Sequence, residues 1–192
     1  MARNKAFEPE EKLEKARDLF WQKGYNATSM QDLVETMELN RGSIYDTYGD
    51  KHTLFLQCLR SYTDSTFEDY QRTVEEAKSP IKAVEKIIKR AALRTIAEGK
   101  TCMGVKSAFE LASVDEEVHA ILKENTTNMV AVLKELLKKA QKAGEINSKR
   151  DPAMLANFIV SNFTGFWQSY LVYGDPELLQ QQAEFLVKSI KK

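Results

Sequence analysis

The residues M-E-L-N-R-G-S-I-Y-D-T-Y-G-D-K (37–51) place two short apolar-periodic segments on either side of a very short gap. Only Glu38, Leu39 and Asn40 separate Met37, the end of the first segment, from the start of the second. Two short amphipathic helices joined by three residues are typical of a helix-turn-helix, whose second helix enters the DNA major groove. The alternative is an ordinary corner between small helices with a polar rim, and the spacing alone leaves both open.

The first turn of the second helix would carry the base contacts. Asn40 is expected to cap this helix, which places Arg41, Gly42 and Ser43 in its first turn. Glycine is about 1 kcal/mol less favourable there than alanine, but without a Cβ it lets the backbone approach a duplex closely. Arg41 can pair bidentately with a guanine or hold a phosphate, and Ser43 can bond to a base or a phosphate.

The rest of this helix divides into an inward and an outward face. Ile44 and Tyr48 are four residues apart and share the inward face, whereas Tyr45 and Thr47 point elsewhere. An exposed Tyr45 suits a phosphate hydrogen bond or a thymine-methyl contact, although a half-buried core tyrosine is the alternative. Lys51 begins the next helix and can reach a phosphate, or it is simply solvated.

Thr28 and Ser29, at the start of the preceding helix, could bring N–H groups and hydroxyls to a backbone phosphate. The predicted DNA contacts are therefore Thr28, Ser29, Asn40, Arg41, Gly42, Ser43, Tyr45, Thr47 and Lys51.

Proline and glycine mark the helix ends along the whole chain. All four prolines lie where a helix would begin, and several glycines fall just after an apolar-periodic run. Ser29 with Asp32, and Ser113 with Glu116, form capping signatures. The chain is predicted to be all-α, and the expected helices run over residues 9–23, 29–37, 41–48, 51–77, 80–98, 103–112, 114–143, 152–173 and 176–191.

At this point the chain resembles a known family. The run G-Y-N-A-T-S-M-Q-D-L-V-E-T-M-E-L-N-R-G-S-I-Y-D-T-Y-G-D-K-H-T-L-F (24–55) is similar to the DNA-binding domain of tetracycline-repressor (TetR) family transcription regulators, and the likeness covers about residues 9–60. The resemblance implies a homodimer on a palindromic or near-palindromic operator. It also implies phosphate contacts at Thr28, Tyr45 and Lys51, and base contacts from the helix over residues 41–47.

Two features depart from the family pattern. Many relatives have an aromatic-histidine pair where this chain has Asp46 and Thr47, so one phosphate donor is replaced by a weaker one. Asp46 would be repelled by phosphate, so it points to solvent or accepts from a cytosine amino group. Residues 1–56 contain eight Lys and Arg against ten Asp and Glu, a net charge of −2. We therefore expect on the order of four to six phosphate contacts per dimer and a modest salt dependence.

Composition excludes several other classes of protein. The 192 residues are 43% hydrophobic and 29% charged, with zero net charge, as in an ordinary soluble domain. No apolar segment is long enough for a membrane span or a signal core. Cys58 and Cys102 lack metal-ligand spacing, and the two histidines lie in different regions. We expect a cytoplasmic protein without metal, cofactor or catalytic site.

The two C-terminal helices are predicted to dimerise. Residues 152–173 are apolar around almost the whole circumference and carry no charge, so this helix must be buried on several sides. Two such helices from each subunit would form a four-helix bundle, as the resemblance also implies, while the alternative is a purely internal core. The predicted dimer contacts are Phe158, Ser161, Gly165, Phe166, Ser169, Leu178, Phe185 and Leu186.

The middle helices would enclose an effector cavity in this family, although each candidate is equally an ordinary core or edge residue. The candidates are Tyr62, Arg94, Met103, Phe109, Glu110, Met129, Asn162, Phe163, Trp167 and Tyr170.

The sequence thus predicts a three-helix DNA-binding domain over residues 1–50 and an effector-binding and dimerisation bundle over 51–192. The predicted function is a transcription regulator, most simply a repressor released from its operator by a small molecule. The alternatives are a helical dimerising adaptor or small-molecule-binding protein without operator function, and an enzyme, for which no motif speaks.

Overall fold

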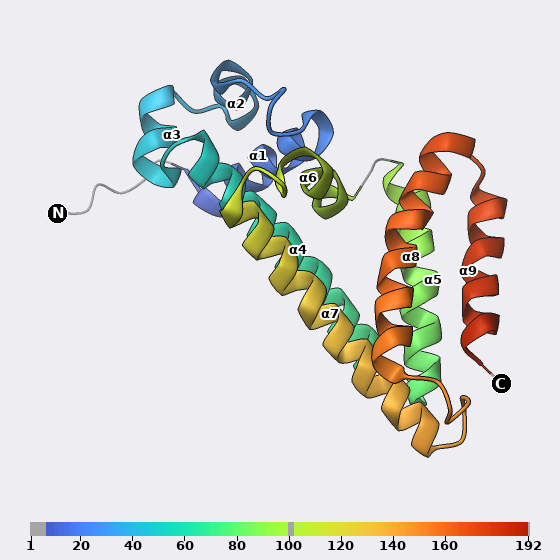
Figure 1. Cartoon of the computed structure of the whole chain (residues 1–192). Coiled ribbons are helices and arrows are strands. Elements are labelled where there is room, and N and C mark those ends of the chain that lie inside the picture. The colour runs from blue at the N-terminus through green and yellow to red at the C-terminus, as the bar shows by residue number, and fades with distance from the viewer. Residues whose placement is uncertain (1–6, 100–101, 192) are drawn as a thin grey trace. The chain divides into compact units, whose positions relative to one another are not determined.

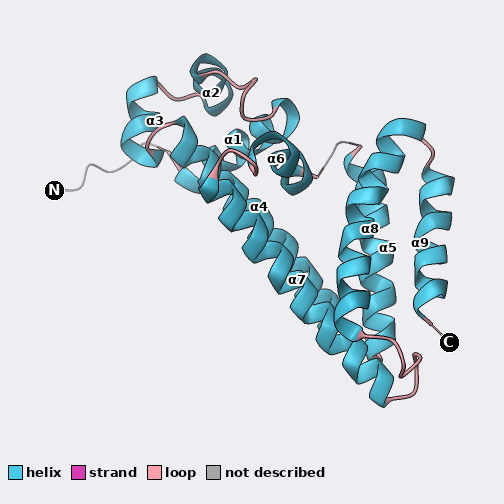
Figure 2. Cartoon of the chain, in the orientation of Figure 1, coloured by secondary structure: helices cyan, strands magenta, loops and turns pink. Residues whose placement is uncertain are grey.

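The structure is a computed structural model that describes residues 7–99 and 102–191. Within these ranges every regular element is a helix and none is a strand (Figure 2). The helices are α1 (Pro9–Lys23), α2 (Met30–Met37), α3 (Arg41–Tyr48), α4 (Lys51–Glu75), α5 (Pro80–Glu98), α6 (Met103–Leu111), α7 (Glu116–Lys142), α8 (Pro152–Tyr173) and α9 (Pro176–Ile190). The all-α prediction is confirmed.

Capping side chains fix the helix ends largely where the sequence places them. Ser29 and Asp32 form the predicted capping box of α2, and the Asn40 side chain accepts from the Ser43 N–H at the start of α3. The cap of α7 differs from the prediction. Its first N–H groups bond to Oδ1 of Asp115, not to Ser113, because a carboxylate is the stronger acceptor. The helix therefore begins two residues later than expected.

The chain divides into two compact units. Unit 1 comprises residues 1–64 and 103–122, and unit 2 comprises residues 65–102 and 123–192. Helices α4 and α7 contribute to both units. The functional boundary predicted after residue 50 stays a prediction, because a packing unit and a functional domain need not coincide.

In unit 1, α2 packs against α1 and α3 around a small apolar core. Phe20, Leu33 and Ile44 are fully buried there. Phe20 and Phe55 meet edge to face with their ring centres 5.1 Å apart. The ring centres of Tyr25 and Phe55 are 4.9 Å apart. The three-residue connection between α2 and α3 is as short as predicted.

In unit 2, α5 packs against both α8 and α9, as Figure 1 shows. Its buried face carries Val84, Ile87 and Ile88, which join apolar residues of α7, α8 and α9 in one core. None of the helices in the described part of the chain is both long and apolar enough to cross a membrane.

Candidate functional site

The exposed face of α3 presents polar side chains, and its opposite face holds the helix in the core. Ile44 and Tyr48 are buried, and the Tyr48 hydroxyl donates to the Pro9 carbonyl at 2.8 Å. Arg41 and Asp46 are exposed, as is 41% of Tyr45. The predicted division of this helix into two faces is confirmed.

Arg41 and Tyr45 form a pair one helical turn apart. Nη2 of Arg41 donates to the Tyr45 hydroxyl at 3.3 Å, and the guanidinium carbon lies 5.7 Å from the ring centre. A cation–π contact at an exposed site contributes about 0.5–1 kcal/mol, which is enough to favour this arrangement without fixing it. The outward face of α3 therefore carries a cation and a hydroxyl held close together.

Gly42 lies in the same first turn, and the fold does not require it to be glycine. A Cβ at this position would meet only Oδ1 of Asn40, at 3.4 Å, which is an ordinary contact. Any benefit of a glycine here must come from outside the chain, which favours the predicted close approach to a duplex.

Three other predicted DNA contacts already have partners within the chain. Asn40 is occupied as the cap of α3. The Ser29 hydroxyl donates to Oδ2 of Asp32 at 2.8 Å and accepts from the Asp32 N–H at 3.1 Å. Thr28 is only 1% exposed, and its hydroxyl donates to the Gly24 carbonyl at 2.6 Å. The expectation of a free hydroxyl at Thr28 is therefore wrong.

Lys51 lies against an aromatic ring. Its Nζ is 4.4 Å from the centre of the Tyr25 ring. Burial lowers the pKa of Lys51, and the nearby carboxylates of Glu110 and Asp32 oppose that change. Ser43 and Thr47 are half-buried at the edges of α3. Asp46 makes no hydrogen bond or ion pair with any residue that the structure describes, so both predictions for it stay open.

The turn between α1 and α2 receives contacts that the sequence did not reveal. Oε2 and Oε1 of Glu110 in α6 accept from the N–H groups of Tyr25 and Asn26, at 3.2 and 2.7 Å. Lys106, one turn earlier in α6, donates to the carbonyls of Trp21 and Gln22 at 3.2 and 2.5 Å. Glu110 was expected beside an effector, but its carboxylate is occupied by this turn.

A hydrogen bond in unit 1 joins the starts of two helices. Nε2 of His52, in the first turn of α4, lies 2.7 Å from Oδ2 of Asp115, which caps α7. Burial raises the pKa of Asp115, but hydrogen bonds from the Val118 N–H and from His52 outweigh it, so the net pKa is lowered. The only sequence signal for this pair was the carboxylate before α7.

In unit 2 a groove of about 760 Å³ lies between α8 and α9. Phe158 and Phe185 line it, yet 50% and 75% of their side chains are exposed within the single chain. Gly165 lies in the groove as well, and a Cβ there would meet nothing within 4 Å. Phe166 and Leu186 are buried, Leu178 and Ser169 are half-buried, and Ser161 is exposed. This exposed aromatic surface is what a helix-packing interface requires.

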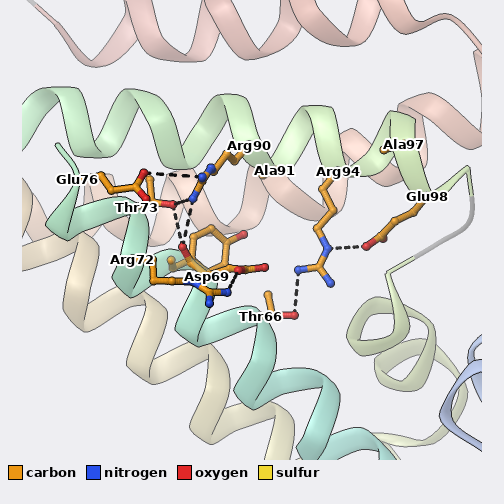
Figure 3. A pocket seen from close by; sticks show the side chains of 11 residues that line it. Thr66, Asp69, Arg72, Thr73, Glu76, Arg90, Ala91, Arg94, Ala97 and Glu98 are labelled. Carbon is orange, nitrogen blue, oxygen red and sulfur yellow. Dashed lines mark hydrogen bonds and ion pairs between the residues drawn. The ribbon is translucent and has the colours of Figure 1, made fainter. Parts of the chain in front are cut away.

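A second cavity, of about 610 Å³, lies between α4 and α5 (Figure 3). Arg94 donates to Oε1 of Glu98 at 2.5 Å and to the Thr66 hydroxyl at 3.1 Å. Arg90 bonds the Thr73 hydroxyl and lies 3.9 Å from Glu76. Oε2 of Glu98 is buried and has no hydrogen-bond partner among the described residues. An unpaired buried carboxylate oxygen is costly, so this cavity offers a ligand one strong acceptor.

Of the ten predicted effector contacts, only Arg94 lines this cavity. Phe109 is 81% exposed, so the expectation of an interior position is wrong. Asn162 lines the α8–α9 groove, and Phe163 stacks on Tyr70 with the ring centres 6.3 Å apart. Tyr62, Met103 and Trp167 are buried, while Met129 and Tyr170 are half-buried. These residues are divided between the two units, so the predicted effector contacts stay a prediction.

Comparisons with known proteins match both parts of the chain. A family model described as "Bacterial regulatory proteins, tetR family" matches residues 13–58, and one described as "Tetracyclin repressor-like, C-terminal domain" matches residues 81–186. The chain is 31% identical to the uncharacterized HTH-type transcriptional regulator YezE of Bacillus subtilis, over 83% of this chain and 84% of that protein. It is 30% identical to the HTH-type transcriptional repressor ComR of Escherichia coli, over 82% and 76%.

Solved structures share the fold. The regulator CifR, as a cysteine mutant complexed with a 26 bp double-strand operator DNA, superposes with a TM-score of 0.85 at 23% identity, covering 97% of this chain and 98% of that one. The reduced form of Escherichia coli NemR superposes with a TM-score of 0.84 at 16% identity, covering 95% and 96%.

Proposed function

The chain belongs to the TetR family of bacterial regulatory proteins, and from this premise we propose how it binds an operator, dimerises and responds to an effector. As a member of this family it is a DNA-binding transcription regulator. We propose that it is a cytoplasmic repressor that binds a palindromic or near-palindromic operator as a homodimer. A small molecule that binds the C-terminal bundle releases it. No catalytic step is part of the proposal.

The exposed face of α3 supports the choice of DNA-contacting residues. Arg41 and Tyr45 are held together on that face, and Gly42 lies beside them where the fold has no need of a glycine. Arg41 contacts a guanine edge or a phosphate, Tyr45 donates to a phosphate, and Gly42 brings the backbone close. Ser29 and Asn40 act through their caps, which orient α2 and α3, and Ser43, Thr47 and Lys51 lie at the edges of the contact.

Fluorescence anisotropy tests this assignment with a labelled duplex that the wild-type protein selects from a random pool. Arg41→Ala is expected to reduce the ratio of operator to random-duplex affinity about tenfold or more, because a bidentate base contact contributes about 1–3 kcal/mol of discrimination. Arg72→Ala, which removes an exposed arginine of unit 2, is the matched control and should leave the ratio unchanged. If Arg41→Ala changed neither affinity, the assignment would be wrong.

The groove between α8 and α9 supports the homodimer. Each subunit would cover the exposed Phe158 and Phe185 of the other, and the open space beside Gly165 lets a partner helix approach closely. Phe185→Glu should lower the mass seen by light scattering from twice the 21.9 kDa of one chain to that of a single chain. Phe109→Glu, at an equally exposed aromatic residue of unit 1, should leave a dimer.

The cavity between α4 and α5 supports an effector that donates a hydrogen bond. The unpaired Oε2 of Glu98 needs an N–H or O–H group, and Arg94 already balances the charge of that carboxylate. We infer a neutral donor such as an amide or an alcohol. Release requires that the ligand bind the form without DNA more tightly than the operator-bound form.

A thermal-shift panel of small amides and alcohols tests this inference. At least one compound should raise the melting temperature of the wild type and not of Glu98→Leu. A panel without any such shift, or the same shift in both proteins, would remove this cavity as the effector site.

The second candidate function is a dimerising adaptor without an operator. It would be supported by a stable dimer that shows no salt-sensitive, sequence-selective binding to any selected duplex.

A further inference from the structure

Helix α6 grips the turn between α1 and α2 through two charged side chains of opposite sign. We name this arrangement the α6 clamp: Lys106 and Glu110 of α6 together with the backbone groups of Trp21, Gln22, Tyr25 and Asn26 that they bind. No part of the clamp touches the exposed face of α3. The backbone groups that accept or donate its four hydrogen bonds all precede α2 in the sequence.

The charges of the clamp match the backbone groups that they meet. Lys106 meets carbonyls of the last turn of α1, where a helix carries partial negative charge, and Glu110 meets N–H groups that no helix satisfies. Hydrogen bonds to charged groups are about twice as strong as neutral ones. A surface lysine or glutamate with a purely solubilising role would not be placed so specifically on both ends of one turn.

The packing around Glu110 is close as well as charged. A Cβ at Gly24 would lie 2.8 Å from Oε2 of Glu110, and Gly24 has a φ of +89°, which only glycine adopts easily. The Thr28 hydroxyl then bonds to the carbonyl of the same Gly24. The turn is thus held from both sides, and little freedom remains between α6 and the helices that follow the turn.

The clamp adds a second connection between the DNA-binding helices and the rest of the chain. The first is α4, which leaves these helices directly and continues into unit 2. The second runs through α6 into α7, whose cap Asp115 is also paired with His52 of α4. These contacts add to the packing of α1 on α4, where Phe20 meets Phe55 and Trp21 meets Tyr62.

We propose that Lys106 and Glu110 are positioning residues for operator binding, which hold the DNA-binding helices at the orientation that a duplex with two half-sites requires. The proposal rests on the proposed homodimer. Both subunits engage one duplex tightly only when each helix is already placed at its half-site, because freedom in that placement lowers the effective concentration of the second binding event.

The test compares a two-half-site duplex, selected from a random pool by the wild-type protein, with the same duplex after one half-site is scrambled. Lys106→Met combined with Glu110→Gln removes both charges and keeps the side-chain lengths. It should weaken binding to the two-half-site duplex about tenfold or more, and binding to the scrambled duplex less than about twofold. Lys106→Arg, which keeps two donors, should behave as wild type.

The matched control is Glu14→Gln with Lys123→Met, the same pair of substitutions at exposed positions outside the clamp. It should bind both duplexes as the wild type does. Active protein is counted by stoichiometric titration, so that partial unfolding is not mistaken for weak binding. If the double variant does not fold, Lys106→Met alone carries the comparison, because it leaves the Glu110 contacts in place.

Three results would overturn a proposal. Equal weakening on both duplexes would show that the clamp acts only on the fold, and no weakening on either would show that it does not matter. A wild-type protein without preference for the two-half-site duplex would refute the proposed dimeric operator binding itself, independently of the clamp.

Discussion

The turn before α2 and the first turn of α3 look alike in sequence but differ in how their polar groups are used. Both combine a glycine with small hydroxyl residues, and both were expected to contact DNA. In the first, the Thr28 hydroxyl and the Ser29 side chain are bound within the chain. In the second, Arg41 and Tyr45 reach outward, and among the described residues they bond to each other. Polar groups that the fold already satisfies build the protein, and those it leaves exposed are available to a partner.

The largest effect on stability is expected from Gly24→Ala, which alters the turn before α2, where the polar groups are hydrogen-bonded within the chain. With a φ of 89° and a ψ of 168°, Gly24 has a conformation that is essentially restricted to glycine and costs an L-residue about 1–3 kcal/mol. The new Cβ would also displace the Glu110 carboxylate, whose Oε2 would lie 2.8 Å away. The displaced Glu110 carboxylate would lose its hydrogen bonds from the Tyr25 and Asn26 N–H groups. We expect a loss of about 3 kcal/mol in the free energy of unfolding. Urea denaturation followed by circular dichroism measures it, and a loss below 1 kcal/mol would contradict the described turn.

Thr28→Val should have the next largest effect. The valine keeps the shape but leaves the buried Gly24 carbonyl without its donor, at a cost of about 1–2 kcal/mol of stability. The operator affinity of the folded fraction should not change, since the hydroxyl is not available to DNA. A loss of operator affinity without a loss of stability would show that the Thr28 hydroxyl contacts DNA.

Gly42→Ala is the counterpart in α3 and should act in the opposite direction on stability. The Cβ fits at 3.4 Å from Asn40, so helix propensity should stabilise the protein by up to about 1 kcal/mol. Operator affinity should fall at the same time, because the methyl group keeps the backbone from the duplex. A stabilised variant with unchanged DNA affinity would show that Gly42 has no role in the contact.

The smallest effect concerns Glu38, the C-cap of α2, which binds Lys15 and Lys12 at 2.6 and 3.0 Å. These ammonium groups lower the pKa of Glu38 to about 2, with the Lys15 hydrogen bond the main cause. A lowered pKa in the folded state contributes stability above the usual value near 4.5, and this contribution is lost as the pH falls towards about 2. Glu38→Gln should therefore be less stable than wild type at pH 7, and the difference should disappear as the pH falls through about 2.

Urea denaturation of both proteins across this range checks the prediction. A difference that persisted at the lowest pH would mean that Glu38 acts through its backbone conformation, since its φ of 54° is the only positive value among the described non-glycine residues.

Local rules were enough to predict the helices and the faces of α3 from the sequence. The Asn40 and Ser29 caps and the inward Ile44 and Tyr48 follow from spacing and residue type within a few positions. Thr28 failed because burial depends on what packs over a residue. Glu110 failed because its partners lie more than eighty positions earlier in the chain, and no periodicity links positions so far apart. The effector candidates stay predictions, because they lie in two separately described units.

The α6 clamp has a consequence for anyone who would build hybrid regulators from this chain. A graft that exchanges residues 1–50 for those of a relative treats the operator-binding part as a portable module. Lys106 and Glu110 would stay behind and face a foreign turn whose backbone they were not selected to hold. A transplant that also carries residues 103–122 would keep the DNA-binding helices together with the side chains that bind their turn.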